Sequence, residues 1–238
     1  EMTMGDWSSD VCSSDLGERP PVAAVVVRGV AVSLSTSVAA LLDTYMSEVF
    51  PATHAPGMQV VVVDKDSVCY TRAFGDAVST NQVTGIGSLT KSMTALAIQQ
   101  LGVDRHTPVT QYLASLHVPD WVTIDRLLTH TSGIATQATL DNIIVGAPGA
   151  FEYANLNYHL LGLVIQAASE ESYDYYMRKH VFEPLGMWDT TADLGRVTDL
   201  LTGHTVFFGK SVPWRMERFF PNGMNKDRKS TRLNSSHP

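Results

Sequence analysis

The chain has 238 residues with a formal net charge of −7 at pH 7, and no run of Lys or Arg stands out. This acidic balance argues against nucleic acid as a partner. The 44% hydrophobic content is ordinary for a globular chain of one domain or most of a larger one. Of the two cysteines, Cys12 falls in an end that is set aside below, and Cys69 alone can form neither an intrachain disulfide nor a cysteine metal site.

The two ends of the chain are related at the level of DNA. One permitted codon choice for residues 6–15 gives a string whose reverse complement, read in frame, encodes residues 227–236. The string also resembles a common sequencing-library adapter. We therefore expect residues 1–16 and 227–238 to be translated adapter rather than two polar tails, and we set them aside before considering the fold.

Residues 17–37 contain an apolar stretch, residues 22–27, that follows Arg19. This pattern is typical of a signal-peptide remnant and favours an exported protein, periplasmic or extracellular. Arg28 interrupts the apolar run, so an ordinary strand or linker is the alternative. No run reaches the roughly 18 apolar residues that a membrane-spanning helix needs, so we predict no membrane span.

Residues 38–226 are predicted to form one partial domain, taken here in chain order. A helical spacing of apolar residues covers residues 38–50 and ends at Pro51. A buried strand over residues 57–63 and an alternating strand over residues 67–74 are predicted to form a hairpin. A hairpin followed by helices is an α+β order. The predicted helices that follow cover residues 88–101, 107–116, 124–130, 156–169 and 173–181.

Ser88-Leu-Thr-Lys91 places a serine at the start of a predicted helix and a lysine one turn later on the same face. A serine hydroxyl is a weak nucleophile that needs a base beside it, and a lysine amine can supply one in a suitable environment. The N–H of Ser88, at a helix N-terminus, could donate to an oxyanion. The tetrad is weak by itself, because a chain with 20 serines and 6 lysines holds roughly half of one such match by chance.

Two further features strengthen the Ser88 hypothesis. Gly85-Ile-Gly87 leads into an apolar helix, and Tyr153-Ala-Asn155 lies 65 residues downstream, just before another apolar helix. A tyrosine near a lysine ammonium can exchange protons with a leaving group. An asparagine can hydrogen-bond a substrate amide or hold the lysine in place. Alone, Tyr153 would be an ordinary aromatic residue and Asn155 a helix cap.

In this order, Ser88-Leu-Thr-Lys91 and Tyr153-Ala-Asn155 resemble the SxxK and YxN motifs of class C β-lactamases and penicillin-binding proteins. The resemblance covers roughly residues 38–215. It implies a β-lactamase/transpeptidase-like fold, in which a helical subdomain packs on an antiparallel sheet and the serine lies at their junction. Three segments are similar to recurrent parts of the esterase and β-lactamase-related branch: residues 125–134, 157–163 and 181–187.

The resemblance implies a serine hydrolase or acyltransferase that works through an acyl-enzyme, without a metal or organic cofactor. Carried over, Ser88 attacks a carbonyl, Lys91 and Tyr153 share the general-base and general-acid work, and Asn155 supports the substrate or Lys91. Family substrates include β-lactams, D-alanyl peptides and small esters, so the expected partner is a small molecule or peptide. The choice among them and the oligomeric state stay open. The alternative is a non-catalytic relative that binds peptidoglycan-like ligands or protein partners.

The third motif of the family, a Lys or His followed by Ser or Thr and Gly on a strand, is absent up to residue 226. Thr202-Gly-His204 and Gly209-Lys-Ser211 precede the region where it is expected and do not fill its role. We therefore expect the fold to be incomplete on its C-terminal side and this fragment to be inactive by itself.

His130 could suggest a serine–histidine pair, but no serine has the Gly-x-Ser-x-Gly context of such a nucleophile. We expect a structural histidine in a turn that ends a helix. His180, Asp189 and Asp193 lack a metal-ligand spacing, so no metal site is predicted.

Overall fold

The computed structural model describes residues 36–64, 67–76, 79–193, 197, 200–207 and 210–214. The expected adapter ends and nearly all of the expected signal-peptide remnant lie outside these residues. The principal elements in chain order are α1 (Thr36–Ala52), β1 (Gly57–Asp64), β2 (Ser67–Gly75), α2 (Thr90–Gln100), α3 (Ile124–Leu128), α4 (Asn155–Ser169), α5 (Tyr173–Met177), β3 (Gly203–Phe207) and β4 (Lys210–Trp214).

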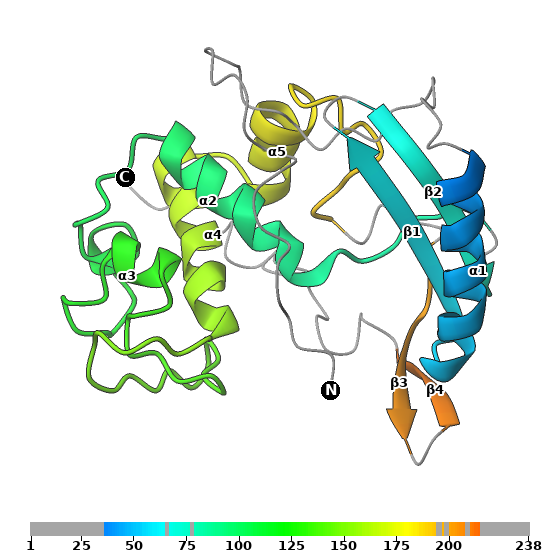
Figure 1. Ribbon diagram of the computed structural model, residues 1–238. Coiled ribbons are helices and arrows are strands. Elements are labelled where there is room, and N and C mark those ends of the chain that lie inside the picture. Colours follow the sequence, from blue (N-terminus) through cyan, green and yellow to red (C-terminus); the bar gives the residue numbers. More distant parts are fainter. Residues whose placement is uncertain are drawn as a thin grey trace, which may run out of the picture.

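The predicted hairpin is present, and α1 lies against it (Figure 1). The prediction that residues 57–63 are buried is wrong: among the described residues β1 belongs to a two-stranded sheet, and its Val61, Val62 and Val63 side chains are exposed. Strands β1 and β2 pair antiparallel along their whole length, with a register shift between Val62 and Val63. The carboxylate of Asp43 in α1 accepts hydrogen bonds from the Tyr70 hydroxyl at 2.7 Å and from Arg72 Nε at 3.0 Å, both on β2. These contacts fix the helix across the hairpin.

Helix α4 is the centre of the helical part, and it packs against α2, α3 and α5 (Figure 1). Its apolar side chains form part of the core, and Leu160, Leu161 and Val164 are fully buried. Tyr173 of α5 crosses to α2, where its hydroxyl bonds the buried Thr94 hydroxyl at 2.7 Å. The described part of the chain therefore has its core among the helices, whose ends carry the candidate site residues.

The predicted helix over residues 107–116 is wrong. Only a 3-10 turn, η2 (Val109–Gln111), forms there. The backbone pairs with a later segment instead, since Val109 N–H donates to Val122 O at 2.9 Å and Ile124 N–H to Thr107 O at 3.1 Å. A backbone group that is bonded to a distant segment cannot also join a helix ladder, so tertiary pairing overrides the apolar spacing.

Several predicted boundaries also shift. Helix α1 runs one residue past Pro51, and a 3-10 turn, η1 (Gly87–Leu89), precedes α2. Helix α5 passes into a π-helical turn, η3 (Arg178–Phe182), within the predicted 173–181 helix. Helix α3 ends at Leu128, before the predicted residue 130, because His130 takes a left-handed conformation with φ of 57°.

The β3–β4 hairpin was not predicted from the sequence; its strands pair antiparallel from Gly203↔Trp214 to Phe207↔Lys210. Within the described residues, none of the helices is both long enough and apolar enough to span a bilayer.

Candidate active site

Ser88 and Lys91 lie where the chain leaves the hairpin region and enters the helical core. Ser88 is the middle residue of η1, and Lys91 is in the first turn of α2. Gly87 has a φ of 53°, a left-handed conformation that glycine adopts without steric cost. In this turn Ser88 is exposed to solvent, whereas Lys91 is half-buried.

Tyr153 and Asn155 reach the same place from the segment that leads into α4. Tyr153 is in an extended segment, and Asn155 is the first residue of α4. The extended segment runs beside the chain that follows α3, because Gly149 N–H donates to Thr131 O at 2.9 Å and Glu152 N–H donates to His130 O at 2.8 Å. These backbone hydrogen bonds set the position from which the Tyr153 side chain extends.

The four candidate residues predicted from the sequence come together in one hydrogen-bonded group. The Ser88 Oγ and Tyr153 Oη atoms are 2.6 Å apart. Lys91 Nζ donates to Ser88 Oγ at 3.2 Å and to Asn155 Oδ1 at 2.9 Å. Both Tyr153 and Lys91 are thus within proton-transfer reach of the Ser88 hydroxyl. Asn155 contacts Lys91, one of the two roles expected for it.

The environment of Tyr153 favours its deprotonated form. Hydrogen bonding from Lys91, and then from Ser88, holds the pKa of the Tyr153 phenol below its ordinary value of 10.0, although burial opposes the shift. The Lys91 ammonium also lies 4.9 Å from the centroid of the Tyr153 ring. A positive charge and hydrogen-bond donors both stabilise a phenolate. A larger fraction of Tyr153 is therefore deprotonated near neutral pH than of an isolated tyrosine, so more of it is available as a base.

Sequence reasoning missed the residues behind this group. Tyr158 is buried, and the centroid of its ring lies 5.6 Å from Lys91 Nζ. Burial, and then the neighbouring Tyr153, raise the pKa of the Tyr158 phenol. The ring of His130, expected to be a structural residue of a turn, lies against the Tyr153 ring with centroids 4.7 Å apart. The fully buried Asn157 bonds His130. The only sequence signal was that these residues fall inside segments similar to the family.

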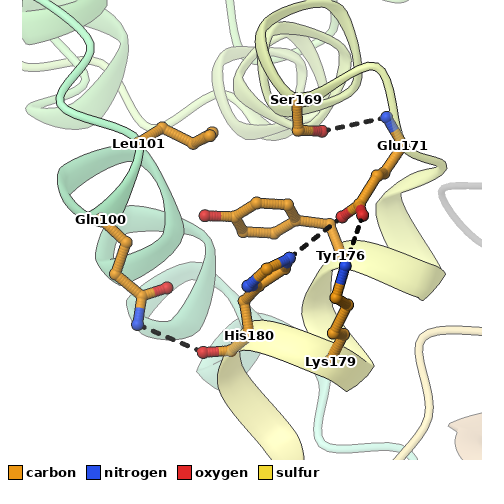
Figure 2. Close-up of a pocket in the computed structure, with 7 residues that line it drawn as sticks. All are labelled: Gln100, Leu101, Ser169, Glu171, Tyr176, Lys179 and His180. Atoms are coloured by element: carbon orange, nitrogen blue, oxygen red, sulfur yellow. Dashed lines mark hydrogen bonds and ion pairs between the residues drawn. The ribbon is translucent and has the colours of Figure 1, made fainter.

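A separate pocket of about 530 Å³ lies at the far end of α2, beside α5 and η3 (Figure 2). There the Glu171 carboxylate accepts hydrogen bonds from Lys179 at 3.0 Å and from His180 at 3.1 Å, so Glu171 is paired with the opposite charge of Lys179. The length of α2, about 16 Å for 11 residues, separates the pocket from Ser88. No cluster of three or more metal-ligating side chains occurs in the part of the chain that the structure describes.

Comparison with known proteins assigns the family. The family model Beta-lactamase matches residues 38–227. Protein flp from Staphylococcus aureus (strain MW2) is 29% identical over 187 residues, which cover 63% of this chain and 37% of that protein. The chain thus spans well under half the length of this curated relative.

Solved structures agree on the fold. The octameric penicillin-binding protein homologue from Pyrococcus abyssi has a TM-score of 0.61 and 26% identity over 74% of this chain and 50% of its own. A class C beta-lactamase shares the fold with a TM-score of 0.63, at 19% identity over 76% of this chain and 57% of its own. The expected β-lactamase/transpeptidase-like fold is confirmed. The chain belongs to the beta-lactamase family.

Proposed function

We propose that this protein is a serine hydrolase or acyltransferase that works through an acyl-enzyme on Ser88. The observation that supports this most is the contact of the Ser88 hydroxyl with both Tyr153 Oη at 2.6 Å and Lys91 Nζ at 3.2 Å. A serine needs an adjacent base to become a nucleophile, and two groups of suitable chemistry lie beside this one. Membership of a hydrolase family agrees with this assignment.

Tyr153 is the proposed general base and Lys91 its electrostatic partner. The shorter contact joins Ser88 to Tyr153, and the lowered pKa of Tyr153 favours a phenolate that can take the Ser88 proton. As Ser88 Oγ bonds the substrate carbonyl carbon, its proton passes to Tyr153 Oη. When the intermediate collapses, the bond to the leaving group breaks and this proton goes to that group, which leaves Ser88 acylated.

Deacylation reverses the roles of these groups. A water molecule attacks the acyl carbon, Tyr153 takes a proton from it, and Ser88 recovers its proton as the ester bond breaks. An alcohol or amine in place of water completes acyl transfer instead of hydrolysis. The backbone N–H of Ser88 is the proposed donor to the oxyanion. A second donor on the expected third-motif strand would lie outside the described residues.

The proposed substrate is a β-lactam, a D-alanyl peptide or a small ester, since each offers a carbonyl with a leaving group. Asn155 holds Lys91 through its Oδ1 atom and leaves its amide N–H groups to approach a substrate carbonyl. The site residues Ser88, Tyr153 and Asn155 are all exposed, so a ligand can reach them from solvent. No metal or organic cofactor enters this mechanism.

Labelling with a fluorophosphonate probe tests the nucleophile. A parent protein that includes the expected third-motif strand should be labelled when purified, and Ser88→Ala in it should abolish the labelling. Ser92→Ala is the matched control, because Ser92 lies one helical turn away with its hydroxyl bonded to Leu89 O. Labelling that survives in Ser88→Ala would refute the assignment. A folded parent protein with the third motif that never reacts would favour the non-catalytic binding module.

A further inference from the structure

The imidazole of His130 is surrounded by aromatic rings at the back of the candidate site. Its centroid lies 4.7 Å from that of Tyr153, 5.2 Å from that of Tyr158, and 5.9 Å from that of Phe151. The His130 residue is only 7% exposed, while Tyr153 is 39% exposed. The buried ring therefore lies against the ring of a tyrosine that is itself partly open to solvent.

The His130 ring is held in one protonation state by its neighbours. Its Nδ1 atom faces the backbone N–H of Ala154 at 3.3 Å and Nδ2 of Asn157 at 2.9 Å. A backbone N–H can only donate, so Nδ1 must accept and the neutral ring carries its proton on Nε2. Burial, and then the charge of Lys91, lower the pKa of His130, in agreement with a neutral ring.

Asn157 is itself fixed by a buried hydroxyl. Ser132 Oγ donates to Asn157 Oδ1 at 2.7 Å and accepts from Ile134 N–H at 3.2 Å, and both Ser132 and Asn157 are fully buried. Because Asn157 Oδ1 is occupied as an acceptor, its amide nitrogen is directed toward His130. A buried chain of hydrogen bonds thus runs from Ser132 through Asn157 to the ring that contacts Tyr153.

The backbone of His130 is tied to the same segment. Its carbonyl accepts from Glu152 N–H at 2.8 Å, and its left-handed φ of 57° is a conformation in which Asn, Asp and His are enriched. His130 therefore accepts hydrogen bonds from the residues on both sides of Tyr153: its carbonyl accepts from Glu152 N–H, and its ring accepts from Ala154 N–H.

We propose that His130 is a positioning residue that holds the Tyr153 phenol between Ser88 and Lys91, through a neutral ring fixed by Asn157 and Ser132. The proposal rests on the proposed function, in which Tyr153 is the general base. His130 does not touch the reacting atoms. The titratable groups around Tyr153 are Lys91, His130 and Tyr158, and of these His130 alone has hydrogen bonds to the backbone on both sides of Tyr153.

His130→Asn is the discriminating variant. Asparagine tolerates the left-handed backbone and offers an Oδ1 acceptor near the position of Nδ1, but it removes the ring beneath Tyr153. We expect acylation by a p-nitrophenyl ester at pH 7 to fall roughly 10- to 100-fold, as for a displacement of about 1 Å in a catalytic group. The acidic limb of the pH–rate profile should move to higher pH, because a phenol held less closely to Lys91 has a pKa nearer its ordinary value.

The outcomes separate this proposal from the proposed function. If wild-type protein is acylated, and folded His130→Asn has an unchanged rate and pH profile, the positioning role is refuted. If the wild-type parent protein, with the expected third-motif strand present, forms no acyl adduct, the proposed function itself fails. A uniform loss of activity with an unmoved acidic limb would mean that His130 serves folding alone.

A measurement on unaltered protein keeps the proposal testable if His130→Asn does not fold. In protein labelled with ¹⁵N-histidine, His130 is identified by its nuclear Overhauser effects to the Tyr153 ring. We expect the tautomer protonated on Nε2 at pH 8. An Nδ1-protonated ring would overturn the proposal.

Discussion

Replacing Tyr153 with Phe removes a single oxygen atom, the one that lies 2.6 Å from Ser88 Oγ. The ring that packs on His130 and beneath Lys91 stays in place. The variant therefore removes the proposed general base while it retains the packing around it. This makes it a sharper test of the proton route than a truncation to alanine.

The expected loss follows from general acid–base catalysis. Such catalysis contributes roughly 10²- to 10⁴-fold, which corresponds to about 2.7 to 5.5 kcal/mol of activation free energy. The Tyr153 hydroxyl lies at an exposed position, so we expect the free energy of unfolding to change by less than about 0.5 kcal/mol. A large loss of rate with little loss of stability is the specific expectation.

Stopped-flow acylation by a p-nitrophenyl ester measures the rate, and urea denaturation measures the stability. Tyr175→Phe is the matched control, because Tyr175 is 42% exposed, close to the 39% of Tyr153, but lies in α5. The control should acylate at the wild-type rate. If Tyr153→Phe also acylates within about threefold of wild type, Tyr153 is not the base and the proton must leave Ser88 through another group.

Three further changes test the electrostatics and the core. Lys91→Met should shift the acidic limb of the acylation profile to higher pH, because the pKa of Tyr153 is then no longer lowered by the ammonium; an unmoved limb in stopped-flow assays would count against the pairing. Asp43→Asn should destabilise the protein more at pH 7 than at pH 3. The hydrogen bond from Tyr70 lowers the pKa of Asp43 below its ordinary value of 3.8. The contribution of the Asp43 carboxylate to the free energy of unfolding is therefore present above that pH and is lost as the pH falls through the lowered pKa. Equal effects in urea titrations at both pH values would contradict this. Leu161→Ala, at a fully buried position, should reduce the free energy of unfolding by about 2–5 kcal/mol in urea denaturation, and a loss under about 1 kcal/mol would show that the core is misassigned.

The elements that the sequence predicted well are those whose local pattern agrees with their surroundings. Helix α4 has apolar residues that match the faces it buries, and the predicted bounds of β1, β2 and α4 differ from the structure by one residue at most. The predicted burial of residues 57–63 is the exception, because Val61, Val62 and Val63 are exposed. The wrong or missed elements are those whose conformation depends on more than their own apolar spacing. Residues 107–109 bond to residues 122–124, and β4 contains Pro213, which weakens any strand pattern.

The same contrast holds for the candidate site. Ser88 and Lys91 are three residues apart on one turn, so their proximity is a matter of helical geometry. Tyr153 is 65 residues from Ser88, and only the resemblance to a known family linked the two in the sequence. The contact between His130 and Tyr153 depends on a left-handed residue and on two paired loops, which no periodicity encodes.

Intact-mass analysis of the parent protein, with the expected third-motif strand present and quenched during turnover of a penicillin or an activated ester, tests the acyl-enzyme on Ser88 most directly. We predict one added acyl group per chain, located by peptide mapping to the peptide that holds Ser88 and absent from Ser88→Ala. An adduct on any other residue, or a folded protein that turns over the ester without an adduct on Ser88, would contradict the mechanism.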